Sequence, residues 1–196
     1  MSSNTNRSAP AWPGDPSELT VETVDFVGVA HVLANTCCWG GRSLTFYSLA
    51  QRALTVCKGV EQLGGLGGED SQRLALHALL GDAWRAWVPG KQAERDAVQG
   101  AVLKAAGLER DLPEQWDRAL ELTRLQAEAA ERRDLAGAGT ASGGQDGGLL
   151  FPPLKARIRP MRPDRAAAQW LERFEALRAA VLRTAEPGAP AKGGEK

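Results

Sequence analysis

Apolar side chains recur every three or four residues through most of this chain, a spacing that places them on one face of a helix. Residues 114–135 are the clearest case, because they are rich in Ala, Leu and Glu and contain no Gly or Pro. No stretch alternates apolar and polar residues over the length of a strand, so the predicted fold class is all-α. Five further helices are predicted at residues 18–35, 46–60, 70–87, 93–106 and 163–183.

Segments without this period divide the chain. Residues 1–17 are rich in Ser, Asn and Pro and are predicted to be a disordered N-terminal segment. A single domain is then predicted over residues 18–184, long enough to bury a core of packed helices. Within it, residues 137–148 are mostly Gly, Ala and Ser, which predicts a flexible linker. The proline-rich stretch that follows, FPPLKARIRPMRP, predicts an extended strap, and residues 185–196 predict a disordered tail.

Composition excludes several classes of function. The chain has 196 residues, with 24 basic and 24 acidic side chains, so its net charge of zero makes nucleic acid an unlikely partner. No apolar run approaches the roughly 20 residues of a membrane span, and the polar start lacks the apolar core of a signal peptide. A cytoplasmic protein without membrane contact is therefore expected. Three cysteines, none in a Cys-x-x-Cys pair, and only two histidines leave little material for a metal site.

Three segments carry a resemblance to a known family. The first contains Ala30-His31-Val32-Leu33-Ala34-Asn35, then Trp39-Gly40-Gly41, and then Phe46-Tyr47-Ser48-Leu49-Ala50-Gln51. The second is Ala78-Leu79-Leu80-Gly81-Asp82-Ala83, and the third joins Arg157-Ile158-Arg159-Pro160 to Trp170-Leu171 and Phe174. Together they resemble the small HD-domain phosphohydrolases of bacteria and phages.

The resemblance implies an HD-domain-like helical bundle of about six helices. Members of that family hold a metal with a histidine, a His-Asp pair and a distant aspartate, and they hydrolyse phosphate esters, commonly of deoxynucleotides. The metal polarises the phosphoryl oxygen and activates a water. In family members, a residue at the place of Trp39 could stack a nucleobase.

The residues at the matched ligand positions are different in this chain. Arg52 stands where the family has its first histidine, Gly81-Asp82 where it has His-Asp, and Arg124 where the alignment puts the distant aspartate. Glu121 and Glu128 are the alternatives for that last position. Two further family positions, a histidine after Gly-Gly and an acidic residue three places beyond the aspartate, are Arg42 and Arg85 here.

One carboxylate among several guanidinium groups offers a divalent cation one ligand and repels it, so no metal cofactor is expected. Asp82 is interpreted as the remnant of a dismantled site, and no catalytic residue is assigned. Two interpretations of Arg42, Arg52, Arg85 and Arg124 remain open. Either they point to solvent or pair with nearby carboxylates, or they converge near Asp82 and bind phosphate or a nucleotide through forked contacts.

The sequence thus predicts a catalytically degenerate relative of the HD phosphohydrolases that acts as a binding or interaction module. The expected partners are a nucleotide or another phosphate-bearing small molecule, a second copy of the chain, or another protein. The alternative is an active nucleotide phosphohydrolase with a relocated site, built from Asp82, Glu121 or Glu128 and the arginines, which would need Mn, Co, Fe or Mg.

Overall fold

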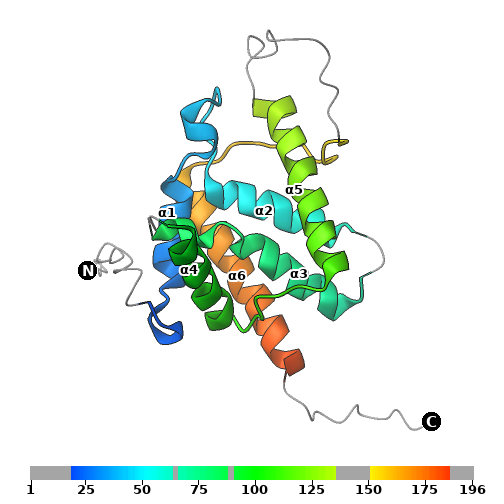
Figure 1. The fold of residues 1–196 in the computed structure, drawn as a ribbon. Coiled ribbons are helices and arrows are strands. Elements are labelled where there is room, and N and C mark those ends of the chain that lie inside the picture. The colour runs from blue at the N-terminus through cyan, green and yellow to red at the C-terminus, as the bar shows by residue number, and fades with distance from the viewer. Residues whose placement is uncertain (1–18, 64–65, 88–90, 136–150, 186–196) are drawn as a thin grey trace, which may run out of the picture.

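The computed structural model describes residues 19–63, 66–87, 91–135 and 151–185, and these residues are largely helical (Figure 1). The predicted all-α class is confirmed, because the described residues contain no strand and extended segments meet only at an isolated bridge between Cys37 and Ser48. The predicted N-terminal segment and linker, and nearly all of the predicted tail, lie outside these residues. The α-helices are α1 (Phe26–Asn35), α2 (Leu49–Glu61), α3 (Gly68–Leu80), α4 (Gln92–Ala105), α5 (Glu114–Leu135) and α6 (Pro163–Ala185), and the 3-10 turns are η2 (Val21–Thr23), η3 (Cys38–Gly41) and η4 (Ala83–Ala86).

Three predicted helices were drawn too long, and side-chain capping explains two of the differences. Residues 18–35 do not form one helix, because α1 begins only after Asp25, whose carboxylate accepts a hydrogen bond from the Val27 amide at 3.0 Å. The helix predicted over residues 46–60 begins later than expected, because Ser48 caps α2. Tyr47 before it is extended, and its carbonyl accepts a hydrogen bond from Cys38 N at 2.8 Å. The helix predicted over residues 70–87 is too long at its end, because α3 ends at Leu80 and residues 83–86 form the separate turn η4.

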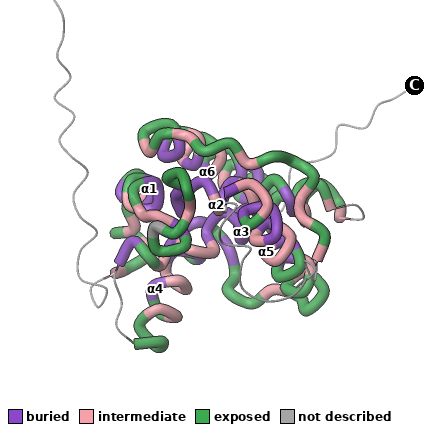
Figure 2. Tube along the Cα trace, turned by 90° about the horizontal axis from the view of Figure 1, so that it is seen from above, coloured by how far each residue is buried: buried purple, intermediate pink, exposed green. Residues whose placement is uncertain are grey.

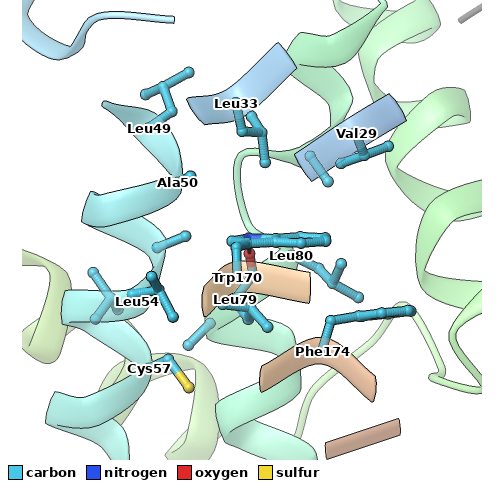
Figure 3. Packing of buried hydrophobic residues seen from close by; sticks show 14 of the residues in the cluster. Val29, Leu33, Leu49, Ala50, Leu54, Cys57, Leu79, Leu80, Trp170 and Phe174 are labelled. Atoms are coloured by element: carbon cyan, nitrogen blue, oxygen red, sulfur yellow. Dashed lines mark hydrogen bonds between the residues drawn. The ribbon is translucent and has the colours of Figure 1, made fainter. Parts of the chain in front are cut away.

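The core lies where α6 packs against α1 and α3, and α2 packs against α3 and α5 (Figure 1). Trp170 of α6 is fully buried at its centre and donates its indole N–H to the Leu79 carbonyl at 3.3 Å (Figure 3). Its ring stacks on Phe174, and Phe174 stacks on Phe26 of α1. Burial follows this interior, and exposed positions follow the outer sides of the helices (Figure 2). None of the described helices is both long and apolar enough to span a membrane.

An extended strap, residues 151–162, crosses from α5 to α6 and is fastened to the end of α5. The Arg133 guanidinium donates to the carbonyls of Leu154 and Ala156, both at 2.9 Å. Asp134 accepts hydrogen bonds from the Ile158 amide at 2.8 Å and from Arg157 at 2.6 Å. These contacts place the strap over α2 and fix the direction in which the chain enters α6.

Candidate functional site

The residues that the sequence singled out come from three elements that meet in one place. Arg52 lies on the first turn of α2, Gly81 and Asp82 connect α3 to η4, and Arg124 lies in the middle of α5. Because α2 packs against both α3 and α5, these positions, about 30 and 40 residues apart in sequence, become neighbours in space. We call this group, with Arg85 and Glu131, the Asp82 cluster.

The Asp82 carboxylate forms an ion pair with an arginine of the adjoining turn. The Arg85 Nε donates to Asp82 Oδ1 at 2.9 Å, three residues further along η4. The Arg85 guanidinium also lies over the Trp84 ring, 4.5 Å from its centroid. The carboxylate that the sequence analysis interpreted as a remnant of a metal site is therefore paired with a cation.

Arg124 covers the glycine that stands beside Asp82. A Cβ built on Gly81 would lie 2.7 Å from Arg124 Nη2, so the guanidinium rests in the space that a side chain at 81 would fill. Arg124 also forms a long ion pair, 3.7 Å, with Glu121 one turn earlier on α5. The positions matched to the His-Asp pair and the distant aspartate of the HD family thus lie against one another.

Arg52 faces a buried carboxylate that the sequence analysis did not identify. Glu131 of α5 is 1% exposed, and its Oε1 lies 3.7 Å from Arg52 Nε. The other carboxylate oxygen accepts the indole N–H of Trp39 at 2.9 Å. Trp39 holds a φ of +58°, a backbone conformation that side chains other than glycine rarely adopt, and this hydrogen bond fixes it there.

Burial decides the direction of the pKa shift at Glu131 but not at Arg52. It raises the pKa of the Glu131 carboxyl above its ordinary value, although Arg52 and the Trp39 indole oppose the shift. Burial disfavours the charge on Arg52 as well, but Glu131 and then Asp82 outweigh it and raise the pKa of the guanidinium. Arg52 therefore stays charged between the two carboxylates.

Neighbouring groups that could act as nucleophiles or bases are inert. Burial raises the pKa of the Cys38 thiol to about 12, and Glu131 adds to the shift. Burial lowers the pKa of His77 to about 4, with Arg73 and Arg124 adding to the shift, so its imidazole is neutral at physiological pH. Among the described residues, no group of three or more His, Cys, Asp or Glu side chains is placed to hold a metal ion.

Arg42 does not join the cluster. It is exposed on the loop of residues 39–46, and in the described part of the chain no carboxylate lies within ion-pair distance of it. The structure thus brings three of the four predicted arginines to Asp82 and leaves the fourth at the surface. Each of those three has a carboxylate within ion-pair distance. Both interpretations of the arginines stay open, because pairing belongs to the first and convergence near Asp82 to the second.

Glu131 is the residue that sequence reasoning missed, and a signal for it was present. It follows Arg124 by seven residues, which is two helical turns, so both belong to one face of α5. Thr123, Ala127 and Ala130 make the same face buried. A glutamate within a buried stripe indicates a paired charge rather than a solvated one.

Comparison with known proteins adds no identification. No protein-family model matches this chain, and no curated protein matches it.

Proposed function

We propose that this protein is a catalytically degenerate relative of the HD phosphohydrolases and acts as a binding or interaction module instead of a hydrolase. One observation carries the proposal: the positions matched to the family's ligands meet at Asp82, and guanidinium groups stand where metal ligands would be needed. The chemistry of these residues does not fit a metal. Asp82 is engaged by Arg85, and Arg52 and Arg124 would repel a divalent cation.

A second feature favours interaction with another macromolecule. The described residues expose six large apolar side chains, and three of them, Trp39, Leu44 and Phe46, lie on the loop of residues 39–46. The loop is held in place at both ends and at its tip, where the Leu44 amide donates to the Leu135 carbonyl at 3.3 Å. Clustered exposed apolar side chains on a fixed loop are typical of binding surfaces.

The direct test is an assay for hydrolysis. Purified protein incubated with manganese, cobalt or magnesium and a panel of deoxynucleotides is expected to release no phosphate, triphosphate or nucleoside. Metal analysis of the protein as purified is expected to find no stoichiometric Mn, Fe or Co. Turnover that disappears in Asp82→Asn would overturn the proposal and support the relocated active site.

The relationship to the family can be tested by restoring the missing ligands. The triple variant Arg52→His, Gly81→His, Arg124→Asp supplies two imidazoles and a carboxylate beside Asp82, and it also removes the guanidinium that a side chain at 81 would meet. We expect this variant to bind Co²⁺, seen by its visible absorption. The control Arg165→His, Gly100→His, Arg183→Asp makes the same changes elsewhere. A folded restored variant that binds no more Co²⁺ than the control contradicts the proposed descent.

Phosphate is the ligand that we propose for the cluster itself, and Arg124 is the observation that favours it. Its partner Glu121 is 3.7 Å away and 60% exposed, so this guanidinium is the least committed of the three. A deoxynucleotide is expected to raise the melting temperature without added metal, and Arg124→Gln to abolish the rise. Arg118→Gln, one turn and a half earlier on α5, is the control. A rise that survives in Arg124→Gln would exclude the cluster as the phosphate site.

A further inference from the structure

A cavity of about 220 Å³ lies between α2 and the strap, away from the Asp82 cluster. One wall is the face of α2 that runs from Gln51 to Gln62, the opposite wall is the strap, and Gln169 of α6 closes one side. Neither Arg52, Asp82 nor Arg124 lines it. Its chemistry can therefore be considered separately from that of the cluster.

The lining of this cavity is positively charged. Three cationic residues, Lys58, Arg157 and Arg159, line it, and no acidic residue does. Arg157 is paired with Asp134 at 2.6 Å. For Lys58 and Arg159 the described residues offer no carboxylate within 4.0 Å. Two cationic residues without a carboxylate partner line one cavity, so the local charge there favours an anion. This local charge is not a consequence of the whole chain, whose net charge is zero.

The rest of the lining is amphipathic. Leu54, Leu154, Ile158 and Met161 supply apolar surface, while Gln62 and Gln169 supply amides that no described side chain or backbone group engages. Gly59 lets the strap approach closely, because a Cβ at this position would lie 3.2 Å from Leu154 Cδ2. A ligand in this cavity would contact cationic and amide groups at one part and apolar side chains at another.

Both walls are fixed before any ligand arrives. The Arg133 and Asp134 contacts hold the strap from α5. From α2, the buried Gln51 amide reaches the strap backbone: with its nitrogen toward Met161 O the distance is 3.3 Å, and its oxygen then accepts from Met161 N at 2.9 Å. A preformed pocket loses little conformational entropy on binding.

We propose that this cavity binds a small organic anion, with its carboxylate or phosphate group at Lys58 and Arg159 and its apolar body against Leu54, Leu154, Ile158 and Met161. The volume sets the size of the ligand. Because it lies below the roughly 300–1,000 Å³ of pockets for drug-sized molecules, the ligand is about as large as benzoate or phenyl phosphate. The strap, which the sequence analysis predicted only as an extended connection, thereby acquires a binding role.

Isothermal titration calorimetry with four probes tests the proposal. Benzoate and phenyl phosphate carry both features, inorganic phosphate lacks the apolar body, and benzyl alcohol lacks the charge. At least one of the two aromatic anions is expected to bind with a stoichiometry near one, and the preferred one identifies the head group. Lys58→Gln with Arg159→Gln is expected to weaken that binding at least tenfold. The matched control is Lys104→Gln with Arg183→Gln, exposed on α4 and α6, which should leave it unchanged.

Several results would overturn this assignment. Neither aromatic anion binding at millimolar concentration would exclude the ligand class. Equal affinity for inorganic phosphate or for benzyl alcohol would remove the amphipathic argument. Unchanged affinity in the Lys58 and Arg159 variant, or affinity lost in Arg124→Gln instead, would place the anion elsewhere. None of these results depends on whether the protein hydrolyses nucleotides or on whether the restored variant binds Co²⁺.

Discussion

Arg52 and Glu131 are unequal partners, because their burial differs. The side chain of Glu131 is fully buried, whereas that of Arg52 is 29% exposed and also lies within the field of Asp82. Removing the arginine leaves a buried carboxylate without a cation, held by hydrogen bonds from the neutral Trp39 indole and Tyr47 hydroxyl. Removing the carboxylate leaves a guanidinium that is still partly exposed to water and still lies within the field of Asp82. The two single substitutions should therefore differ in cost.

We expect Arg52→Gln to lower the free energy of unfolding by about 2–4 kcal/mol, somewhat less than the loss of a partner from a fully buried pair. Glu131→Gln keeps an acceptor for Trp39 and removes the charge that burial disfavours, so its cost should be below about 1 kcal/mol. The double variant should recover most of the loss of Arg52→Gln. Urea denaturation at pH 7 measures all three, and a larger cost for Glu131→Gln would contradict this account.

The pH dependence gives the same pair a second signature. Because the pKa of Glu131 is raised in the folded protein, the folded state binds its proton more tightly than the unfolded state does. Its contribution to stability is fully present below the unfolded pKa and is lost as pH rises through the folded pKa. Relative to Glu131→Gln, the wild type should thus gain stability on acidification from roughly pH 8 to roughly pH 4. Parallel curves for the two proteins would contradict the shift.

At this scale, four residues that the sequence analysis grouped are neighbours in the structure, whereas the family resemblance behind that grouping stays a prediction. Arg52, Asp82, Arg85 and Arg124 were assigned to one place, and they lie together. Their partners could not be predicted in the same way. Which carboxylate meets Arg52 depends on how α5 is rotated against α2, and the sequence of neither helix contains that rotation.

The strap and the last turn of α5 form the element on which the cavity depends. Asp134 has a side chain that is only 4% exposed, although it carries a full charge. Hydrogen bonds from Arg133, and then from the Ile158 amide and Arg157, hold its pKa far below the ordinary value of 3.8 against the opposing effect of burial. An ionised carboxylate therefore fastens the strap at Arg157 and Ile158, in addition to the bonds from Arg133 to Leu154 and Ala156.

Asp134→Asn should release the strap and destabilise the protein by about 1–3 kcal/mol at pH 7, the cost of unsatisfied buried donors. A depressed pKa contributes stability that is present above the unfolded pKa and is lost as pH falls toward the folded pKa. The difference from wild type should thus shrink as pH falls below the ordinary aspartate value. Denaturation at a series of pH values, with trypsin cleavage at Lys155 as a second measurement, tests this. Asp111→Asn is the control, because Asp111 is exposed and makes no contact with the strap in the hydrogen bonds described above.

Gly59 of α2 and Gly81, the C-cap of α3 with helical dihedral angles, predict opposite outcomes for one substitution. At Gly81 a Cβ would meet the flexible end of Arg124, which can move, and the helical backbone favours alanine. At Gly59 it would lie 2.6 Å from Thr123 Cγ2 inside the packed interface of α2 and α5. Gly81→Ala should change stability by less than about 1 kcal/mol, and Gly59→Ala should cost about 1–3 kcal/mol. Thr123→Ser, which removes that methyl group, should recover part of the second loss in thermal melts.

An element was predicted to its exact bounds where its composition alone defines it. The bounds of α5 agree with the prediction at both residues, because a continuous run of strong helix formers needs no partner to define it. The predicted helix over residues 70–87 failed at Gly81, where the chain turns into η4 and presents Asp82. The spacing of apolar residues does not mark that turn, because Ala83 and Ala86 would be buried in a continuous helix and are also buried in η4.

On the scale of the whole molecule, the helices share one core, and its centre is a single side chain. Trp170 of α6 lies among buried side chains of α1, α2 and α3, which are helices far apart in the sequence (Figure 3). Phe26, Phe174 and Trp170 form one stacked column. A core that is continuous in this way should unfold in one cooperative step, with α6 stabilising the helices that carry the Asp82 cluster.

The size of that contribution can be measured by comparing two tryptophans. Trp170→Phe removes a ring and the hydrogen bond to Leu79 from a fully buried position, so we expect a loss of about 2–3 kcal/mol. Trp84 is half-buried and stacks against Arg85 and Arg95, so Trp84→Phe should cost below about 1 kcal/mol. Calorimetry should show one transition for each protein, with equal calorimetric and van't Hoff enthalpies. If Trp170→Phe instead produced two transitions, α6 would stabilise only part of the bundle, and changes at the Asp82 cluster would then be independent of the core.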